Sequence, residues 1–256
     1  MASVARALGV SRSSLYYISR MESKDWSIKV RMEDELCINP SYGSRRLAMA
    51  LGMSRERAQR IMRKYGIKPY RRRRRKYYRS KGKRIFPNLL LEVMPLYENH
   101  VWATDFTELI YRNRKVYVST VIDLFTRKVI GLHVAIRKGT PLTIQTLANA
   151  LFHQPPCKIF HSDNGREYQA KVFTDLLEKC GITVSRSRPK CPWENGYQES
   201  FYGKFKVDLG DPGRFKTLGE LVAEIYRIAW HYNHRRIHSA LRMPPVIYAQ
   251  LQQKTA

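Results

Sequence analysis

One carboxylate stands inside the stretch WATDFT (residues 102–107), where Asp105 is flanked by strand-forming side chains. A charge inside such a strand costs free energy unless it is paired or bound to a metal ion. Two other acids stand out in the same way. Asp163 lies in HSDNG (residues 161–165), where a short apolar run ends in a turn, and Glu199 lies in the helix-like stretch ENGYQESF (residues 194–201). These three acids, on two strands and one helix, form the candidate site.

The order of the predicted elements indicates an α/β fold. Three apolar, β-branched strands come first and look antiparallel, and helices then alternate with two short strands. The expected strands are 101–110, 116–124, 129–135, 158–161 and 182–185, and the expected helices are 142–152, 170–179 and 195–209. This is the order of the ribonuclease H-like fold. We therefore expect a mixed five-stranded sheet with helices packed against it.

Divalent-metal chemistry explains why three acids would be held together. Mg²⁺ prefers hard oxygen ligands and keeps waters and substrate phosphates in the rest of its shell. Two such ions about 4 Å apart can activate a nucleophile and stabilise the leaving oxygen of an in-line displacement. We therefore predict that Asp105, Asp163 and Glu199 are the catalytic and metal-binding residues, with 35 residues between the last two.

The helix that carries Glu199 has two different faces. Counting in steps of three and four places Asn195, Glu199, Gly203 and Lys206 on a polar face, and Tyr197, Phe201, Phe205 and Leu209 on an apolar face. The apolar face is expected to pack on the sheet. The polar face would then present Glu199 to the metal ions. Asn195 and Lys206 would be available to DNA, and Gly203 would allow a DNA backbone to approach closely.

Plainer interpretations of the single acids stay open. Alone, Asp105 fits a buried structural acid, Asp163 fits an Asp-Asn-Gly turn, and Glu199 fits a surface position on a helix. Glu194 competes with Glu199 for the third place, although it precedes the helix. Asp123, in the strand-like VIDL, is interpreted as structural. The joint occurrence of three acids in matching contexts favours the catalytic interpretation.

The charge of the chain points to a polyanionic partner. The 256 residues include 47 Lys and Arg against 21 Asp and Glu, a net charge of +26. Such a field favours nucleic acid or an anionic membrane as the partner. Residues 1–84 carry +18 and residues 85–256 carry +8. The N-terminal third is therefore expected to be the main electrostatic contact, and no apolar run reaches the roughly 18 residues of a membrane span.

Residues 40–67 have the signature of a helix-turn-helix. A helix over 44–51 is followed by a turn at Gly52 and by Ser54, a good N-cap for a second helix. This second helix is basic, and three of its cations, Arg55, Arg57 and Arg60, are predicted to bind DNA. A small basic helical bundle is the alternative. A shorter segment, with a turn at Gly9 and a cap at Ser11, is an equally open case for a second such motif.

A dense run of cations, RRRRRK, occupies residues 71–76. Like charges at this density cannot pack, so the run is expected to be a solvated arm that binds phosphates by counterion release. The predicted DNA contacts therefore include Arg71, Arg72, Arg73, Arg74, Arg75 and Lys76. We expect a DNA-binding region at 1–68, a basic linker at 69–96, a catalytic core at 97–210 and a helical tail at 211–256.

The tail adds two further candidates for DNA contact. A capping box at Thr217 and Glu220 opens a helix with an apolar stripe. Arg235 and Arg236 follow it, close to three histidines, and are predicted to bind DNA; a plain solvated helix end is the alternative. His161 is a candidate for ordering the turn at Asp163.

Other chemistries have little support in the sequence. The four cysteines form no CxxC pair, which disfavours a zinc site or a disulfide framework and fits a reducing cytoplasm. We find no HExxH pair, no GxSxG elbow and no P-loop. We expect a cytoplasmic, nucleoid-associated protein of a prokaryotic host.

Several motifs together resemble one known family. They are WATDFT at 102–107, IDLFTR at 122–127, HSDNGREY at 161–168, EN at 194–195 with ESF at 199–201, and the stretch from YN at 232–233 to HSAL at 238–241. With these motifs the chain resembles the OrfB transposases of the insertion-sequence-three family, whose core belongs to the DDE and retroviral integrase superfamily. Residues 8–14 and 42–47 resemble the N-terminal region of that family.

The resemblance implies an activity, cofactors and partners. It implies that Asp105, Asp163 and Glu199 bind two Mg²⁺ or Mn²⁺ ions and direct cleavage at transposon ends. The resulting 3′-OH would then attack a second phosphodiester. The implied partners are double-stranded DNA, as terminal inverted repeats and as target, a homo-oligomer of at least two chains, and an upstream OrfA product, separate or fused by frameshift. The loop CPWENG (residues 191–196) departs from the expected Pro-x-Asp-Asn-Ala pattern.

Two alternatives to a transposase follow from the same residues. A DNA-binding regulator with a non-catalytic integrase-like core would use the helix-turn-helix alone, but it would not need three intact acids. An RNA-cleaving ribonuclease H would not need the helix-turn-helix and usually carries a further acid.

Overall fold

The protein is described by a computed structural model that covers residues 2–7, 9–11, 13, 20–70, 86–188 and 191–255. It divides into two compact units, Met1–Pro69 and Tyr70–Ala256, and each is described by itself. The predicted basic arm at residues 71–76 and most of the segment after Ser11 lie outside the described residues.

The N-terminal unit is helical, as the sequence predicts. Its helices are α1 (Ala2–Ala7), α2 (Arg20–Ile38), α3 (Ser44–Ala50) and α4 (Arg55–Lys64). Ser54 caps α4, because its hydroxyl accepts a hydrogen bond from the Arg57 backbone N–H at 3.2 Å. Gly52 and Gly66 both have positive φ, and they turn the chain at the ends of α3 and α4. The buried core of this unit is Ile28, Met32, Ala48, Ala58 and Ile61.

The second unit is built on a mixed five-stranded sheet. Its strands are β1 (Val101–Tyr111), β2 (Arg114–Asp123), β3 (Val129–Ala135), β4 (Ile159–Ser162) and β5 (Thr183–Arg186). The strand order is β3-β2-β1-β4-β5, with antiparallel pairing among the first three strands and parallel pairing of β4 with β1 and with β5. This confirms the predicted ribonuclease H-like arrangement, with the strand that carries Asp105 at the centre.

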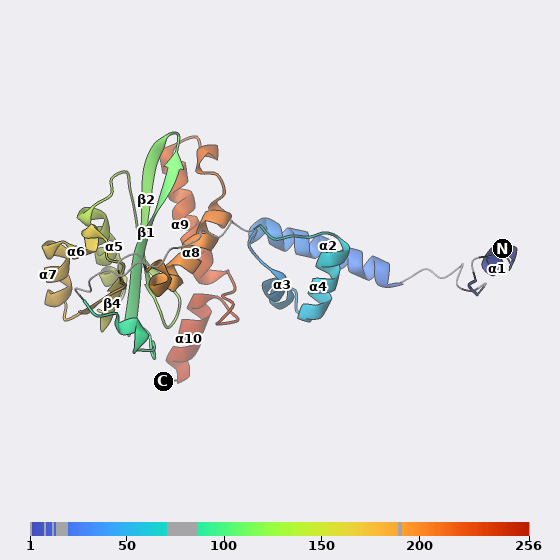
Figure 1. Cartoon of the computed structure of the whole chain (residues 1–256), viewed down its shortest axis with the longest axis horizontal. Helices are drawn as coiled ribbons and strands as arrows, with labels where there is room; N and C mark the ends of the chain where they lie inside the picture. The colour runs from blue at the N-terminus through green and yellow to red at the C-terminus, as the bar shows by residue number, and fades with distance from the viewer. Residues whose placement is uncertain are drawn as a thin grey trace. The chain divides into compact units, whose positions relative to one another are not determined.

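Helices cover both faces of the sheet (Figure 1). One face carries α5 (Thr140–His153), α6 (Arg166–Gln169) and α7 (Lys171–Lys179), and the other carries α8 (Gly196–Leu209), α9 (Leu218–His234) and α10 (Pro245–Thr255). Three short 3₁₀ turns, η2 (Leu89–Leu91), η3 (Pro192–Asn195) and η4 (Pro212–Arg214), occupy connections. No helix in the described part of the chain is long and apolar enough to cross a membrane.

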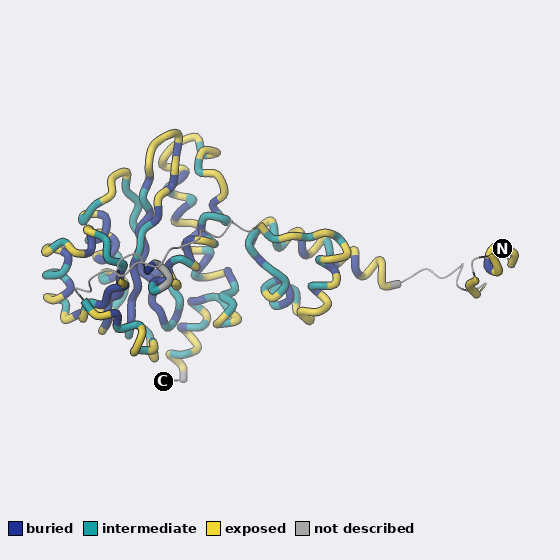
Figure 2. The backbone as a smooth tube through the Cα atoms, in the orientation of Figure 1, coloured by how far each residue is buried: buried dark blue, intermediate teal, exposed yellow. Residues whose placement is uncertain are grey.

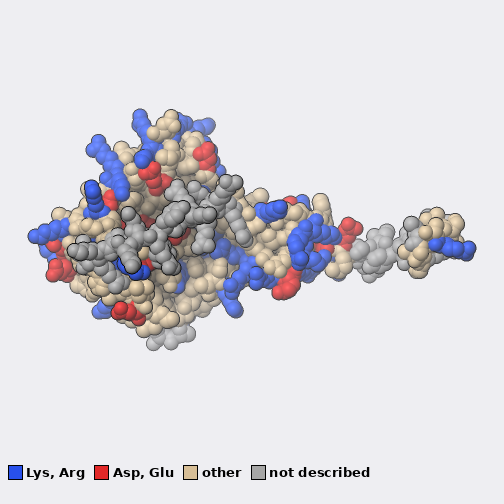
Figure 3. Space-filling view, in the orientation of Figure 1, with Lys and Arg blue, Asp and Glu red and all other residues tan. Residues whose placement is uncertain are grey.

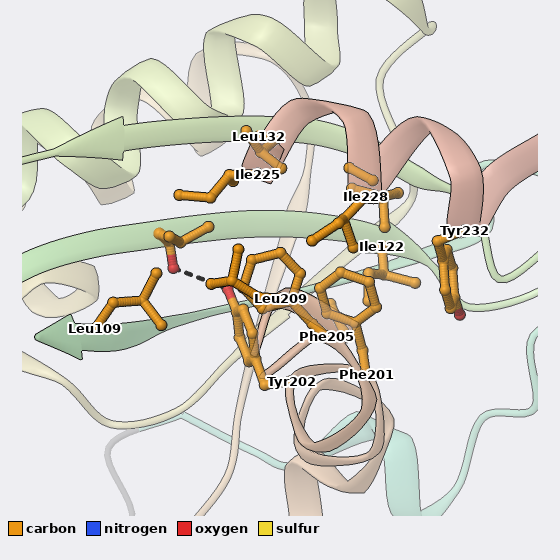
Figure 4. Packing of buried hydrophobic residues seen from close by; sticks show 14 of the residues in the cluster. Leu109, Ile122, Leu132, Phe201, Tyr202, Phe205, Leu209, Ile225, Ile228 and Tyr232 are labelled. Atoms are coloured by element: carbon orange, nitrogen blue, oxygen red, sulfur yellow. Dashed lines mark hydrogen bonds between the residues drawn. The ribbon is translucent and has the colours of Figure 1, made fainter. Parts of the chain in front are cut away.

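Two apolar clusters hold these layers together, and they run along the buried strands of the sheet (Figure 2). The cluster under α8 and α9 includes Phe201, Phe205 and Leu209 of α8, which face Leu109, Ile122 and Leu132 of the sheet (Figure 4). Burial of large aromatic side chains makes this face of α8 the main anchor of the helix.

The structure differs from the expected organisation at three points. The predicted tail is not a separate body, because Leu221, Ile225, Ile228 and Tyr232 of α9 belong to the same apolar cluster as α8. The helices α6 and α10 were not expected. Tyr197 was predicted to lie on the apolar face of α8, and this is wrong, because its side chain is exposed whereas Gln198 and Tyr202 are buried.

Candidate active site

Asp105 and Asp163 lie at the same level of two neighbouring strands. Parallel pairing of β1 with β4 sets Val101 opposite Ile159, and the same register, continued past the end of β4, sets Asp105 opposite Asp163. Paired positions on parallel strands direct their side chains to the same face of a sheet, and neighbouring strands are about 4.8 Å apart. Both aspartates are partly buried. The sheet alone therefore brings the first two predicted acids together.

Helix α8 brings the third acid to the same strand. Its polar side chains reach the backbone of β1 at three successive carbonyls: Asn195 donates to Thr104 at 3.0 Å, Gln198 donates to Ala103 at 2.6 Å, and the Tyr202 hydroxyl donates to Asp105 at 2.8 Å. The Thr120 hydroxyl on β2 lies within hydrogen-bonding distance of both Gln198 Oε1, at 3.0 Å, and the Tyr202 hydroxyl, at 2.9 Å. Glu199 lies between these anchors, in the first turn of α8.

The electrostatics show that the other two acids act on Asp105. Burial and the charges of Asp163 and Glu199 together raise the pKa of Asp105 to about 8, against a backbone hydrogen bond from Phe106 and the charge of Lys206. Burial likewise raises the pKa of Asp163. Partly buried carboxylates that repel one another are the donors that a divalent cation stabilises.

The three carboxylates are suitable ligands for a divalent cation, but they lie too far apart to bind one ion together. Among the residues that the structure describes, no three His, Cys, Asp or Glu side chains converge closely enough to hold a metal ion. Coordination of one ion by Asp105, Asp163 and Glu199 together therefore stays a prediction. It requires a movement of the acids toward one another.

A fourth carboxylate and two cations near Asp163 were missed from the sequence. A Cβ on Gly165 would lie 2.8 Å from Glu167 Oε2 and 2.9 Å from Asp163 Oδ1, so a larger residue here would displace one of these carboxylates. Glu167 is buried and pairs with Lys138 at 3.0 Å, and the charges of Lys138 and Arg186 lower the pKa of Asp163. The HSDNGREY motif contains Glu167, but no spacing in the sequence links it to Lys138.

The competing residues have other roles in the structure. Glu194 binds Arg188 at 2.6 Å and Asn88 at 2.8 Å. Asp123 is fully buried and accepts hydrogen bonds from the backbone of the following turn, which agrees with its structural interpretation. His161 lies buried between the hydroxyls of Ser185 and Ser187, and burial lowers its pKa to about 4, so the ring is neutral at physiological pH.

Two of the predicted DNA contacts need correction. Asn195 is buried against β1, and Arg236 is buried and paired with Asp208, so both side chains hold elements together. Arg60 forms a two-pronged ion pair with the buried Asp25, at 2.7 and 2.6 Å, but its side chain is exposed. Its contact with DNA stays a prediction.

Four of the other candidates belong to the described residues. Arg55, Arg57 and Arg235 are exposed, and Lys206 lies close enough to Asp105 for its charge to lower the pKa of that acid. Basic side chains gather over the α2–α4 region of the helical unit (Figure 3). Contact of these residues with DNA stays a prediction.

Fold and site together define an integrase-type core. The family model described as "Integrase core domain" matches residues 96–192, and a second model of the same description matches residues 180–245. The HTLV-2 integrase catalytic core domain in complex with magnesium has the same fold, with a TM-score of 0.51 and 19% identity over 61% of this chain and 99% of that chain.

Curated relatives narrow the class to one family. The transposase for insertion sequence element IS904 of Lactococcus lactis subsp. lactis is 32% identical over 65% of this chain and 68% of its own length. A transposase-like protein of Haemophilus influenzae is 30% identical over 79% of this chain and 96% of its own length. The chain belongs to the insertion-sequence transposases with an integrase core. It is a polynucleotidyl transferase of the DDE class.

Proposed function

We propose that this transposase cleaves DNA at the ends of its element and joins the freed 3′-OH to a second phosphodiester, with Asp105, Asp163 and Glu199 as its catalytic residues. The observation that supports the assignment is the anchoring of the start of α8, which carries Glu199, to three successive carbonyls of β1, which carries Asp105. The effect of Asp163 and Glu199 on the pKa of Asp105 supports the same grouping.

Each acid has a defined task in this proposal. Asp105 and Asp163 would hold two Mg²⁺ or Mn²⁺ ions from the sheet, and Glu199 would complete the set from α8. The ions, when bound, activate the nucleophile and stabilise the leaving oxygen. Lys206, whose charge acts on Asp105, would bind a DNA phosphate.

Both chemical steps are in-line displacements at phosphorus. In the first, a water oxygen attacks the phosphodiester and the P–O3′ bond breaks, which leaves a 3′-OH at the end of the element. In the second, that hydroxyl attacks a phosphodiester of another DNA segment, and the 3′ oxygen of the attacked strand leaves. Because two element ends must be joined, we expect the protein to work as an oligomer of at least two chains on DNA. An OrfA partner stays an expectation from the sequence.

The test is an end-cleavage and joining assay with the purified chain. A labelled duplex carrying the element's own end is incubated with Mg²⁺, Mn²⁺ or EDTA. We expect a metal-dependent nick at the terminus and joined products, and Glu199→Gln should abolish both while Glu194→Gln leaves the nick in place. Asp105→Asn should abolish joining but retain DNA binding.

Binding without any nick, under either metal, would contradict the catalytic assignment. It would favour a DNA-binding regulator, and the open spacing of the three acids is the observation that supports this second candidate.

A further inference from the structure

A second site lies on the side of α8 that faces away from the predicted catalytic acids. It is a cavity of about 700 Å³, formed by η2, the turn after β2, the first turns of α8 and the loop that follows α9. Tyr197, Ser200 and Lys204 of α8 line it, but Glu199 does not. Pockets that bind small ligands span about 300–1,000 Å³, so this cavity has the right size for a nucleotide.

The cavity contains a cation with no anionic partner. Arg127 lines it, and its guanidinium Nε and Nη1 are buried without a hydrogen-bond partner. Among the described residues no carboxylate pairs with it, and none of the remaining positions carries an acidic side chain. Buried N–H groups without an acceptor are costly, and an anionic ligand that accepted hydrogen bonds from them would remove that cost.

The turn that carries Arg127 holds it in a strained conformation. Arg127 has φ of +64°, which favours glycine, in a turn closed by its backbone hydrogen bond to Asp123 at 2.8 Å. The carboxylate of Asp123 fixes this turn by accepting hydrogen bonds from Asn99, Phe125 and Thr126. Strain that is maintained by a built network is a feature of functional positions.

An exposed aromatic ring covers the cation. The Arg127 guanidinium lies 4.1 Å from the centroid of the Tyr197 ring, and Tyr197 is 41% exposed. Tyr197 immediately follows the start of α8, beside the loop that departs from the family pattern. The floor of the cavity is apolar and includes Ile122 and Phe201. An anion on Arg127 would therefore have a stacking surface and an apolar wall next to it.

We propose that this cavity binds one nucleotide of an unpaired DNA strand, with its phosphate on Arg127 and its base between Tyr197 and the apolar floor. Arginine donors pair with phosphate in a fork, and aromatic side chains stack on any base. Glu194, the acid at the rim, is already paired with Arg188. The net charge of +26 favours a polyanion over a second copy of this basic chain. The proposal rests on the proposed function only in taking DNA as the ligand.

The test uses the full chain in EDTA, so that no cleavage is required. Titration calorimetry compares dAMP, deoxyadenosine and inorganic phosphate. We expect dAMP to bind at least tenfold more tightly than either fragment, because the site takes both phosphate and base. Arg127→Asn, which tolerates the left-handed backbone, should weaken dAMP binding at least tenfold. Tyr197→Leu should weaken dAMP and deoxyadenosine alike. Arg114→Gln, an exposed cation at the β1–β2 turn, is the matched control and should change neither.

A crosslink locates the bound base. A single-stranded pentanucleotide with 5-iododeoxyuridine at its centre should crosslink to Tyr197, and Arg127→Asn should reduce that yield at least tenfold. Equal dAMP binding by Arg127→Asn and Arg114→Gln, or crosslinks at other peptides only, would overturn the proposal. Phosphate binding as tight as dAMP binding would overturn the nucleotide assignment. If Arg127→Asn lowers the Tm, its weaker binding could come from partial unfolding. The binding of dAMP and deoxyadenosine by Tyr197→Leu then decides whether the proposal holds. A failed cavity test together with intact metal-dependent cleavage leaves the proposed function standing.

Discussion

Asp105 is the predicted site residue whose ionised form is most strongly destabilised. Burial in the middle of a strand removes its hydration, and the charges of Asp163 and Glu199 repel its own charge, so its pKa rises to about 8. Either a proton or a cation relieves this repulsion. The metal-free protein at neutral pH therefore keeps Asp105 largely protonated, and the site is prepared to exchange that proton for a metal ion.

The stability of the metal-free protein should therefore depend on pH through Asp105. The folded chain retains a proton that the unfolded chain loses near the ordinary aspartate pKa of 3.8, so the free energy of unfolding should fall as pH rises from about 4 to about 8. One such proton changes this free energy by up to about 1.4 kcal/mol per pH unit. Asp105→Asn should make the free energy of unfolding depend less on pH. At pH 8 in EDTA the variant should have a higher free energy of unfolding than the wild type, as measured by chemical denaturation.

Magnesium gives the matching control for this prediction. Saturating Mg²⁺ at pH 8 should raise the Tm of the wild type more than that of Asp105→Asn. Parallel pH curves for the two proteins in EDTA would show that Asp105 does not carry the shift.

Most of the site could be predicted at the level of single residues, because each acid has a local context that shows it. Asp105 in a strand and Asp163 at a strand end are visible as interruptions of apolar runs. Lys138 and Glu167 were not predictable in this way. Their contact depends on how α6 packs beside the β3–α5 connection, and local sequence does not encode that packing.

At the scale of elements, the strands and most of the apolar face of α8 were predictable, because Phe201, Phe205 and Leu209 are buried as expected. Tyr197 is exposed instead, and Gln198 and Tyr202 are buried against the sheet. A hydrophobic pattern predicts that a glutamine such as Gln198 lies on the surface. Here it is buried because β1 and β2 offer it carbonyl partners, and this is a tertiary effect.

The anchoring of α8 leads to a prediction for Tyr202. Its hydroxyl lies within hydrogen-bonding distance of the Asp105 and Val118 carbonyls and accepts from Thr120 at 2.9 Å. Tyr202→Phe leaves these buried groups short of a partner, so it should lower the free energy of unfolding by about 1–3 kcal/mol. It should also reduce end cleavage, because Glu199 loses an anchor. Tyr226→Phe, which removes a longer bond of 3.4 Å from a more exposed ring, should change stability by less than about 0.5 kcal/mol.

Variants of two α4 cations, Arg60 and Arg57, should distinguish an effect on stability from an effect on DNA binding. Hydrogen bonds from Arg60 lower the pKa of the buried Asp25 to about 2, so this pair stabilises the helical unit above pH about 4 and loses its effect as pH falls toward 2. Arg60→Gln should lower the Tm, because it weakens the pairing of a buried acceptor and leaves Lys64, at 3.2 Å, as the cation on Asp25. The exposed Arg57→Gln should leave the unfolding curve unchanged and weaken duplex binding. If Arg60→Gln weakens DNA binding but leaves stability unchanged, Arg60 is a DNA contact and not a structural residue.

At the scale of the whole molecule, charge and chemistry are divided between parts of the chain. The predicted catalytic acids belong to the unit Tyr70–Ala256, whereas residues 1–84 hold +18 of the net charge of +26. Composition could predict this division, because charge density needs no knowledge of packing. The position of the tail could not be predicted. Nothing in the stripe of α9 tells whether it packs on its own unit or on another.

The charge division predicts how DNA binding depends on salt. Each phosphate neutralised by a cation contributes about −0.9 to the slope of log K against log salt concentration. Replacing the six cations at residues 71–76 by glutamine should therefore make this slope shallower by up to about 5, and it should weaken binding to all duplex sequences equally. Fluorescence anisotropy at several salt concentrations, with an element end and an unrelated duplex, measures both effects.

Six glutamines at exposed Lys and Arg of the core unit are the control for total charge. An equal change of slope in this control would assign the effect to net charge and not to a DNA-binding arm. A loss confined to the element end would show that the arm reads sequence.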